Sequence, residues 1–226
     1  MKNFTFIFIA LFLTACGDKP QTGEKPLSQS IFVLFENGGT VPEEEKEDAL
    51  NTAFHLFQQL TDLDRRKATR NTQIQIILSA LPNRIAWSGT PRQLLAQAKE
   101  VRELIAFKPS FSDLVMAFEE IETTINLTQP DNIRLYWIGS TIHVPFQNTD
   151  SEIKVEVPQA VPDALALPSF ADQLSVLKVF RVHPDQDQIL QAYLASRGIL
   201  KRARNGTLDF ALLGAAQTKS NLSDLL

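Results

Sequence analysis

The chain has 226 residues with 22 basic and 26 acidic side chains, which gives a formal net charge of −4 at pH 7. A mildly acidic protein is a poor candidate for binding nucleic acid, because basic patches supply most of that affinity. The sequence holds a single cysteine, which excludes an internal disulfide. The length suits one domain with a substantial core.

The first residues predict a cleaved leader. Lys2 precedes an apolar run that ends near residue 13, and this run of about ten residues is too short for a bilayer-spanning helix, which needs about 20. Residues 13–17, Leu-Thr-Ala-Cys-Gly, resemble the lipobox of bacterial lipoproteins. The resemblance implies that the signal peptide 1–15 is removed and that Cys16 is lipidated with diacylglycerol and a fatty acid such as palmitate. An ordinary signal peptide with an incidental cysteine is the alternative.

The mature chain is expected to begin with a tether. Loss of residues 1–15 removes one basic residue, so 22 − 1 = 21 basic and 26 acidic side chains leave a net charge of about −5. Residues 16–29 are the lipidated cysteine and a polar stretch with proline and glycine, which is typical of a flexible tether. In enterobacterial lipoproteins an aspartate directly after the cysteine favours the inner membrane. Gly17 stands there instead, which favours the periplasmic face of the outer membrane over the inner membrane.

From Ser30 onwards, short apolar runs alternate with segments whose apolar residues recur at helical spacing. This alternation predicts right-handed crossovers and a doubly wound, mostly parallel sheet with helices on both faces. The predicted strands are residues 31–35, 74–78, 133–138, 176–182 and 207–213, with a short edge strand at 85–87 and a β-hairpin over 141–157. The predicted helices are residues 42–60, 90–105, 110–125 and 184–198, and residues 217–226 are expected to form a flexible tail.

The order of these elements over residues 31–140 resembles that of a von Willebrand factor A domain. The resemblance implies a three-layer, von Willebrand factor A-like (Rossmann-like) α/β domain over residues 30–216, with the hairpin as an insertion. In that family the first strand is followed by Asp-x-Ser-x-Ser, which holds a divalent cation together with a loop threonine and a later aspartate. Here Glu36 falls at the aspartate, Gly38 and Thr40 at the serines, Ser112 or Ser110 near the threonine, and Ser140 beside the missing aspartate.

These departures change what the resemblance implies about a cofactor. Magnesium requires near-octahedral oxygen ligands at about 2.1 Å. Glu36 is one methylene longer than aspartate, Gly38 has no hydroxyl, and one carboxylate remains. We therefore predict no cofactor, although a divalent cation stays an alternative. The expected site is a partner-binding surface or a degenerate remnant of a metal site, formed by Glu36, Gly38, Thr40, Ser112 and Ser140.

The sequence leaves three functional hypotheses open. The first is a membrane-tethered module for protein–protein interaction or assembly in the cell envelope, for example as an accessory of a secretion or conjugation apparatus. The second is a periplasmic α/β enzyme that uses Glu36 or the region of His183, and the third is a lipoprotein that binds a small ligand. The chain lacks the nucleophile elbow and the phosphate-binding glycine motifs, so we predict no catalytic residues. The basic residues of 201–204 either touch anionic headgroups or form a solvated loop.

Overall fold

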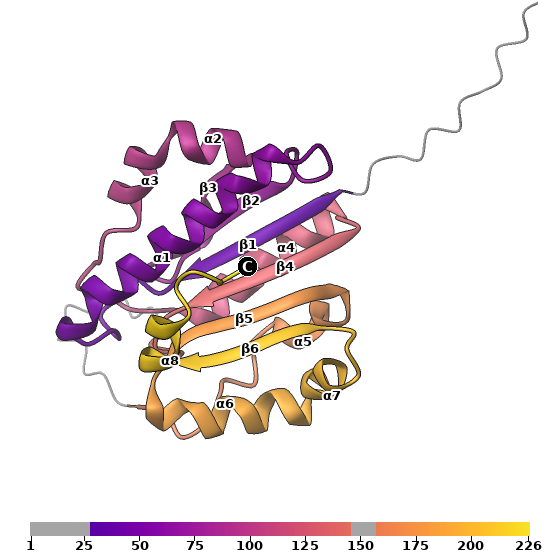
Figure 1. Cartoon of the computed structure of the whole chain (residues 1–226). Helices are drawn as coiled ribbons and strands as arrows, with labels where there is room; N and C mark the ends of the chain where they lie inside the picture. The colour runs from indigo at the N-terminus through magenta and orange to yellow at the C-terminus, as the bar shows by residue number, and fades with distance from the viewer. Residues whose placement is uncertain (1–27, 146–156) are drawn as a thin grey trace, which may run out of the picture.

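Six strands form one mixed sheet at the centre of the computed structural model, which describes residues 28–145 and 157–226. Their order is β3-β2-β1-β4-β5-β6, and neighbouring strands are parallel except for the antiparallel pair β2 and β3 (Figure 1). Six of the seven residues of β1 are buried, as expected for an inner strand that is covered on both faces. The strands are β1 (Gln29–Phe35), β2 (Gln73–Leu78), β3 (Leu81–Gly89), β4 (Asn132–Ile138), β5 (Leu174–Val182) and β6 (Asp209–Gly214).

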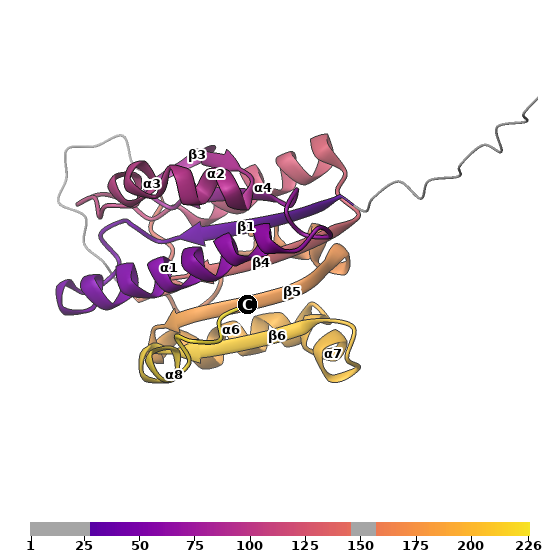
Figure 2. The same ribbon diagram turned by 45° about the horizontal axis from the view of Figure 1, so that its top comes forward.

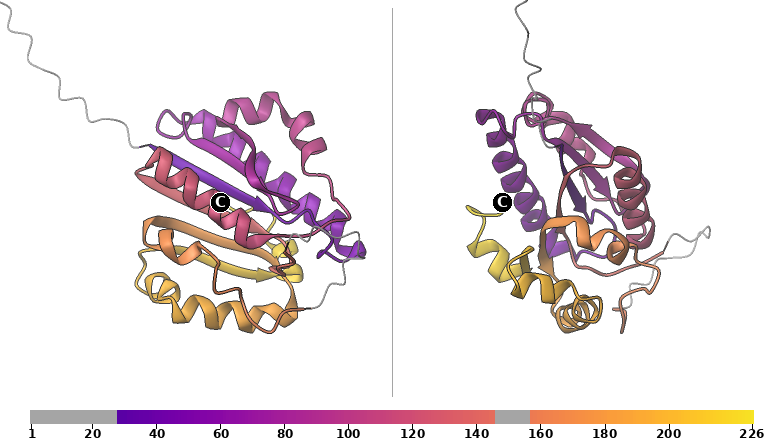
Figure 3. Two further views of the ribbon diagram at one scale, coloured as in Figure 1. Left: turned by 180° about the vertical axis from the view of Figure 1, so that it is seen from behind. Right: turned by 90° about the vertical axis from the view of Figure 1, so that its right-hand side faces the viewer.

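Helices cover both faces of this sheet (Figures 2 and 3). One face lies under α1 (Lys46–Thr61), α2 (Pro91–Ala96), α3 (Ala98–Leu104) and α8 (Ala215–Ser220). The other lies under α4 (Leu114–Thr128), α5 (Leu167–Phe170), α6 (Pro184–Ser196) and α7 (Ile199–Arg204). Short 3-10 helices are η1 (Glu43–Glu45), η2 (Asp62–Arg65) and η3 (Ala171–Gln173). No helix in the described ranges combines the length and apolar character that crossing a bilayer requires.

The parallel strands give the sheet two distinct sides, one where they begin and one where they end. The parallel strands β1, β2, β4, β5 and β6 all end at one edge, here called the carboxyl edge, and all begin at the opposite amino edge. Because each crossover helix runs back against its strand, α1 begins near the carboxyl edge and ends near the amino edge (Figure 1). Loops at the carboxyl edge of such sheets are where ligands usually bind.

The predicted fold class needs correction. The prediction of a von Willebrand factor A-like, doubly wound fold is wrong, because the sheet is mixed and its outermost strand β3 runs antiparallel to β2. The other neighbouring strands are parallel. Two residues, Ser79 and Ala80, separate β2 from β3, and a connection this short permits only an antiparallel pair. The predicted hairpin over 141–157 lies mostly outside the described residues, and its described part contributes one isolated bridge, between Val144 and Ser112.

The C-terminal segment, predicted as a flexible tail over 217–226, instead packs on the domain. Leu225 is fully buried in the core beneath α1. The side-chain amide of Gln59 on α1 donates to the Leu222 carbonyl at 2.8 Å and accepts from the Leu225 N–H at 2.9 Å. These contacts replace the water that a free tail would bind, and they fix the segment against α1.

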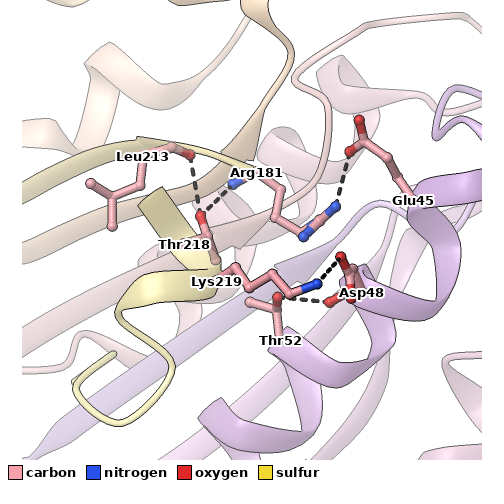
Figure 4. A network of polar contacts seen from close by, with 7 residues as sticks. All are labelled: Glu45, Asp48, Thr52, Arg181, Leu213, Thr218 and Lys219. Carbon is pink, nitrogen blue, oxygen red and sulfur yellow. Dashed lines mark hydrogen bonds and ion pairs between the residues drawn. The ribbon is translucent and has the colours of Figure 1, made fainter. Parts of the chain in front are cut away.

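A polar network holds the start of this segment against α1 and β5 (Figure 4). The backbone N–H of Arg181 donates to Thr218 Oγ1 at 3.1 Å, and the Arg181 guanidinium lies 3.0 Å from the Glu45 carboxylate. Lys219 pairs with Asp48 at 3.3 Å. Arg181 has a φ of 66° at an irregularity in the pairing of β5 with β6, so the network also stabilises a backbone conformation that costs free energy for a non-glycine residue.

Replacing Leu225 with alanine should lower the free energy of unfolding by about 2–4 kcal/mol, because the change leaves a cavity in a closed part of the core. Urea unfolding followed by circular dichroism measures the change. Leu127, which is 79% exposed on α4, provides the matched control, and Leu127→Ala should change stability by less than about 0.5 kcal/mol. Equal effects of the two substitutions would show that the C-terminal segment is not packed.

Candidate functional site at the carboxyl edge

The structure brings the five residues of the predicted site together at the carboxyl edge. Phe35 at the end of β1 pairs with Ile138 at the end of β4, so the residues that follow these two strands meet. Glu36 follows β1, its backbone N–H donates to the Ile138 carbonyl at 2.9 Å, and Ser140 stands just beyond β4. Gly38, Thr40 and Ser112 belong to the two loops that close over this point.

The Glu36 carboxylate is fully buried and surrounded by donors from the chain itself. Its Oε1 accepts from Trp137 Nε1 at 2.6 Å and from the backbone N–H of Thr141 at 2.9 Å. Its Oε2 accepts from Ser140 Oγ at 3.0 Å. The Thr40 hydroxyl also stabilises the charged form, although it makes no hydrogen bond of normal geometry.

Burial raises the pKa of Glu36 to about 7, against the opposing effect of hydrogen bonds from Trp137, Thr141 and Ser140. The low-dielectric interior disfavours a carboxylate, and hydrogen bonds recover part of that cost. Near neutral pH the group therefore exists in both protonation states. In the protonated state the Oε2–H has the Ser140 hydroxyl oxygen, 3.0 Å from Oε2, as an acceptor.

Two tight contacts close the loops over Glu36. A Cβ atom placed on Gly38 would lie 2.2 Å from the carbonyl oxygen of Phe111, and one on Gly139 would lie 2.4 Å from Glu36 Cβ. The Gly39 N–H donates to the Ser110 carbonyl at 2.7 Å. Glycine is required at Gly38 because two backbones approach each other there, and at Gly139 because the Glu36 side chain occupies the space that a Cβ atom would need.

Sequence reasoning missed three residues of this site: Asn37, Trp137 and Thr141. The buried Asn37 donates from its amide to the Ala106 carbonyl at 3.1 Å and accepts from the Ala80 N–H at 3.2 Å. It therefore joins the loops that follow β1, β2 and α3. A polar residue placed directly after a buried strand was the available signal for Asn37. Trp137 gave no such signal, because a tryptophan in an apolar strand is typical of an ordinary core residue.

The donor set does not fit the divalent cation considered from the sequence. The N–H groups of Trp137 and Thr141 point at Glu36, and N–H groups repel a cation where ligand oxygens are needed. Divalent cations are usually held by several oxygen ligands that include carboxylates. Within the described ranges no three His, Cys, Asp or Glu residues cluster for metal binding. Two buried hydroxyls, Thr40 Oγ1 and Ser112 Oγ, have no hydrogen-bond partner in the described part of the chain.

Two of the three histidines accept hydrogen bonds at the starts of helices. His183 Nδ1 accepts from the Asp185 N–H at 3.2 Å and caps α6. His143 Nδ1 accepts from the Leu114 N–H at 3.1 Å at the start of α4, and burial lowers the His143 pKa, with a smaller opposing effect from Asp113. His55 lies in the second half of α1. The His183 region therefore provides a helix cap, and Asp187 lies one turn further on the same helix.

No protein-family model and no curated protein matches this chain. Among solved structures, proximal thread matrix protein 1 from the mussel byssus superposes with a TM-score of 0.51 at 9% identity, covering 88% of this chain and 48% of that one. The PilB minor pilin from Streptococcus sanguinis gives a TM-score of 0.41 at 8% identity, covering 90% of this chain and 63% of that one. A variant of the same pilin gives 0.49 at 7% identity, covering 91% and 62%.

These likenesses concern the fold alone. The chain spans between about half and two thirds of the length of the proteins it superposes on. The two pilin superpositions are too loose to establish a shared fold, whereas the mussel protein superposes on the mixed α/β architecture described above.

Proposed function

We propose that this chain is a lipid-anchored lipoprotein of the bacterial cell envelope whose folded domain works by binding another envelope protein. The anchor is Cys16 in the Leu-Thr-Ala-Cys-Gly sequence, which lies outside the described residues. The absence of aspartate after the cysteine favours the periplasmic face of the outer membrane. Lipid on one cysteine supplies two or more acyl chains, which hold a protein stably where a single chain does not.

The burial and internal hydrogen bonding of the Glu36 carboxylate are the observation that favours binding over catalysis. Its side chain is fully buried, and both carboxylate oxygens accept hydrogen bonds from the chain itself. A general acid or base must come within hydrogen-bond reach of its substrate, which this arrangement prevents. The cluster instead fixes the backbones of the loops above it, as a rigid binding surface requires.

The surface offered to the partner consists of the loops at the carboxyl edge, here called the carboxyl-edge surface. Exposed residues on it include Gly39, Glu43, Glu44, Lys108 and Pro145. Residues 43–48 hold five acidic side chains and one lysine. Opposite charges steer association, so the partner is expected to present a basic surface here.

A photo-crosslinking residue at Lys108 should capture one discrete envelope protein in intact cells, because this exposed position lies on the carboxyl-edge surface. The same residue at the exposed Thr123, on the outer side of α4, is the matched control. Immunoblotting followed by mass spectrometry identifies the product. Normal expression with no specific product at Lys108, Glu44 or Pro145 would contradict the proposed binding surface.

Cys16→Ser should release the protein from membranes, because the serine hydroxyl is not a substrate for thioether formation with diacylglycerol. The expected results are a shift from the membrane fraction to the soluble periplasmic fraction and loss of metabolic palmitate labelling. If the native protein takes up no palmitate and the variant stays equally membrane-bound, the anchor is absent.

The raised pKa of Glu36 is the observation that favours the enzymatic alternative, because perturbed carboxyl groups concentrate at active sites. In that alternative, Glu36→Gln would abolish function in cells. Under the binding proposal, Glu36→Gln preserves the loops and should leave both function in cells and the Lys108 crosslink unchanged. The two hypotheses therefore predict opposite results from one variant.

A further inference from the structure

The amino edge of the sheet carries an exposed basic loop between η2 and β2. Residues 65–70 read Arg-Arg-Lys-Ala-Thr-Arg, and all four cations are exposed. Arg65 pairs with Asp62 at 3.2 Å. No carboxylate in the described part of the chain lies within ion-pair distance of Arg66, Lys67 or Arg70, which together are called the loop basic group.

A second set of cations lies at the same edge on α7. Arg202 is used internally, because its guanidinium donates to the carbonyls of Leu174 at 2.9 Å and Thr207 at 3.1 Å. Lys201 and Arg204 are exposed, and no described carboxylate pairs with them. These two residues are called the α7 basic group.

The segment that leads to Cys16 leaves the domain between the two groups. Ser28 is fixed there by Asp131, whose carboxylate accepts from the Ser28 N–H at 2.7 Å and from its hydroxyl at 2.9 Å. The loop basic group precedes β2, α7 precedes β6, and β1 enters the sheet between β2 and β4. Figures 1 and 3 show the loop and α7 on the same side as the start of β1. Four strand spacings separate β2 from β6, or roughly 20 Å.

The basic amino edge contrasts with the charge of the rest of the molecule. The whole chain has a net charge of −4, and the acidic residues of 43–48 lie at the opposite edge of the sheet. The first turn of α6, with Asp185 and Asp187, also lies at that carboxyl edge.

The amino edge also carries Asp62, Asp64, Asp131, Asp172 and Asp209. Asp62 pairs with Arg65, Asp209 pairs with Lys178, and Asp131 accepts from Ser28. The five cations of the two basic groups therefore outnumber the carboxylates of Asp64 and Asp172, which leaves an excess of positive charge at this edge.

We propose that the amino edge is a membrane-docking surface on which the loop basic group and the α7 basic group bind the headgroups of anionic phospholipids. The proposal rests on the proposed lipid anchor for bringing the domain to the bilayer. Residues 17–27 span at most about 40 Å when extended, so the anchored domain stays within reach of the headgroups. Tethering makes this second contact intramolecular, and weak individual contacts then suffice. Docking in this way turns the carboxyl-edge surface away from the bilayer, towards the proposed partner.

Vesicle flotation tests the docking surface separately from the lipid anchor. The mature chain, residues 16–226, with Cys16→Ser carries neither lipid nor the apolar leader, and its binding is compared on phosphatidylcholine vesicles with and without phosphatidylglycerol. The test variant adds Arg66→Glu, Lys67→Glu and Arg70→Glu. The matched control adds Arg84→Glu, Lys99→Glu and Lys108→Glu, which are equally exposed, change the net charge by the same amount and lie away from the amino edge. Circular dichroism checks that each variant is folded.

The Cys16→Ser chain should bind vesicles with phosphatidylglycerol better than those without, and high salt should remove the difference. The loop variant should lose about tenfold or more of this binding, and Lys201→Glu with Arg204→Glu should also lower it, while the control variant keeps it. Equal binding to both vesicle types, or equal loss in the loop and control variants, overturns the proposal. Palmitate labelling of the native protein decides the anchor independently, so failure of one proposal is not confused with failure of the other.

Discussion

Replacing Glu36 with alanine is expected to lower the free energy of unfolding by about 3 kcal/mol or more, because buried donors that lose their acceptor cost about 1–3 kcal/mol each. The substitution leaves Trp137 Nε1 and the Thr141 N–H without their acceptor, and it removes the partner of the Ser140 hydroxyl. Denaturant unfolding followed by tryptophan fluorescence measures the loss, since Trp137 itself contacts the altered site. If the free energy of unfolding falls no more than when an exposed carboxylate is replaced, the Glu36 carboxylate is not part of a buried hydrogen-bonded cluster.

Glutamine at position 36 should behave differently. Its carbonyl oxygen can accept from Trp137 and Thr141 as Oε1 does now, and its amide can donate to the Ser140 hydroxyl. This arrangement resembles the protonated carboxyl group. We therefore expect Glu36→Gln to be tolerated, and its effect on stability to depend on pH.

The sign of this pH dependence follows from the raised pKa. In the unfolded chain Glu36 ionises near its ordinary value of 4.5, whereas in the folded domain its pKa is about 7. Between these values the folded state holds one more proton, so stability falls as pH rises. The contribution is fully present below pH 4.5 and is lost by pH 7, with a total of about 3 kcal/mol.

Comparison with Glu36→Gln isolates this contribution. The difference in stability between the variant and the native protein should move by about 3 kcal/mol in favour of glutamine from pH 4 to pH 8. Glu119→Gln, at an exposed position on α4, is the matched control and should show no comparable change. If the stability difference between Glu36→Gln and the native protein does not change with pH, Glu36 is not held in a desolvated environment.

The parts of the fold that depend on local pattern were predictable. The inner strands β1, β2 and β4 are rich in apolar residues, and the residues that follow β1 and β4 meet because these parallel strands end at one edge. Glu36 and Ser140 were found through the resemblance to the von Willebrand factor A motif. The extent of β3 was underestimated, since Pro82, Asn83 and Arg84 break its apolar pattern.

The features that the sequence did not reveal depend on tertiary contacts. Residues 217–226 are mostly polar, and their packing depends on the fit of Leu225 beneath α1 and on the distant Gln59. Trp137 has the appearance of an ordinary core residue, yet its indole N–H is one of the groups that make a buried carboxylate tolerable. Neither role is encoded in spacing along the chain, because each partner lies far away in sequence.

Gly38→Ala is expected to lower the free energy of unfolding by about 3 kcal/mol or more, the upper range for overpacking a closed site. The new methyl group would lie 2.2 Å from the Phe111 carbonyl oxygen and 3.1 Å from Ser112 Cβ. Backbone atoms cannot rotate away as a flexible side chain can, so the loops of Gly38 and Phe111 must separate. That separation also breaks the 2.7 Å hydrogen bond from the Gly39 N–H to the Ser110 carbonyl.

Gly214→Ala provides the matched control for this steric argument. A Cβ atom on Gly214 would meet its nearest neighbour at 3.8 Å, an ordinary van der Waals contact, so a change within about 1 kcal/mol is expected. Because the loops moved by Gly38→Ala form the carboxyl-edge surface, the variant should also lose the Lys108 crosslink under conditions where it remains folded. If Gly38→Ala is as stable as Gly214→Ala and still forms the Lys108 crosslink, the loops over Glu36 are neither tightly packed nor required for binding.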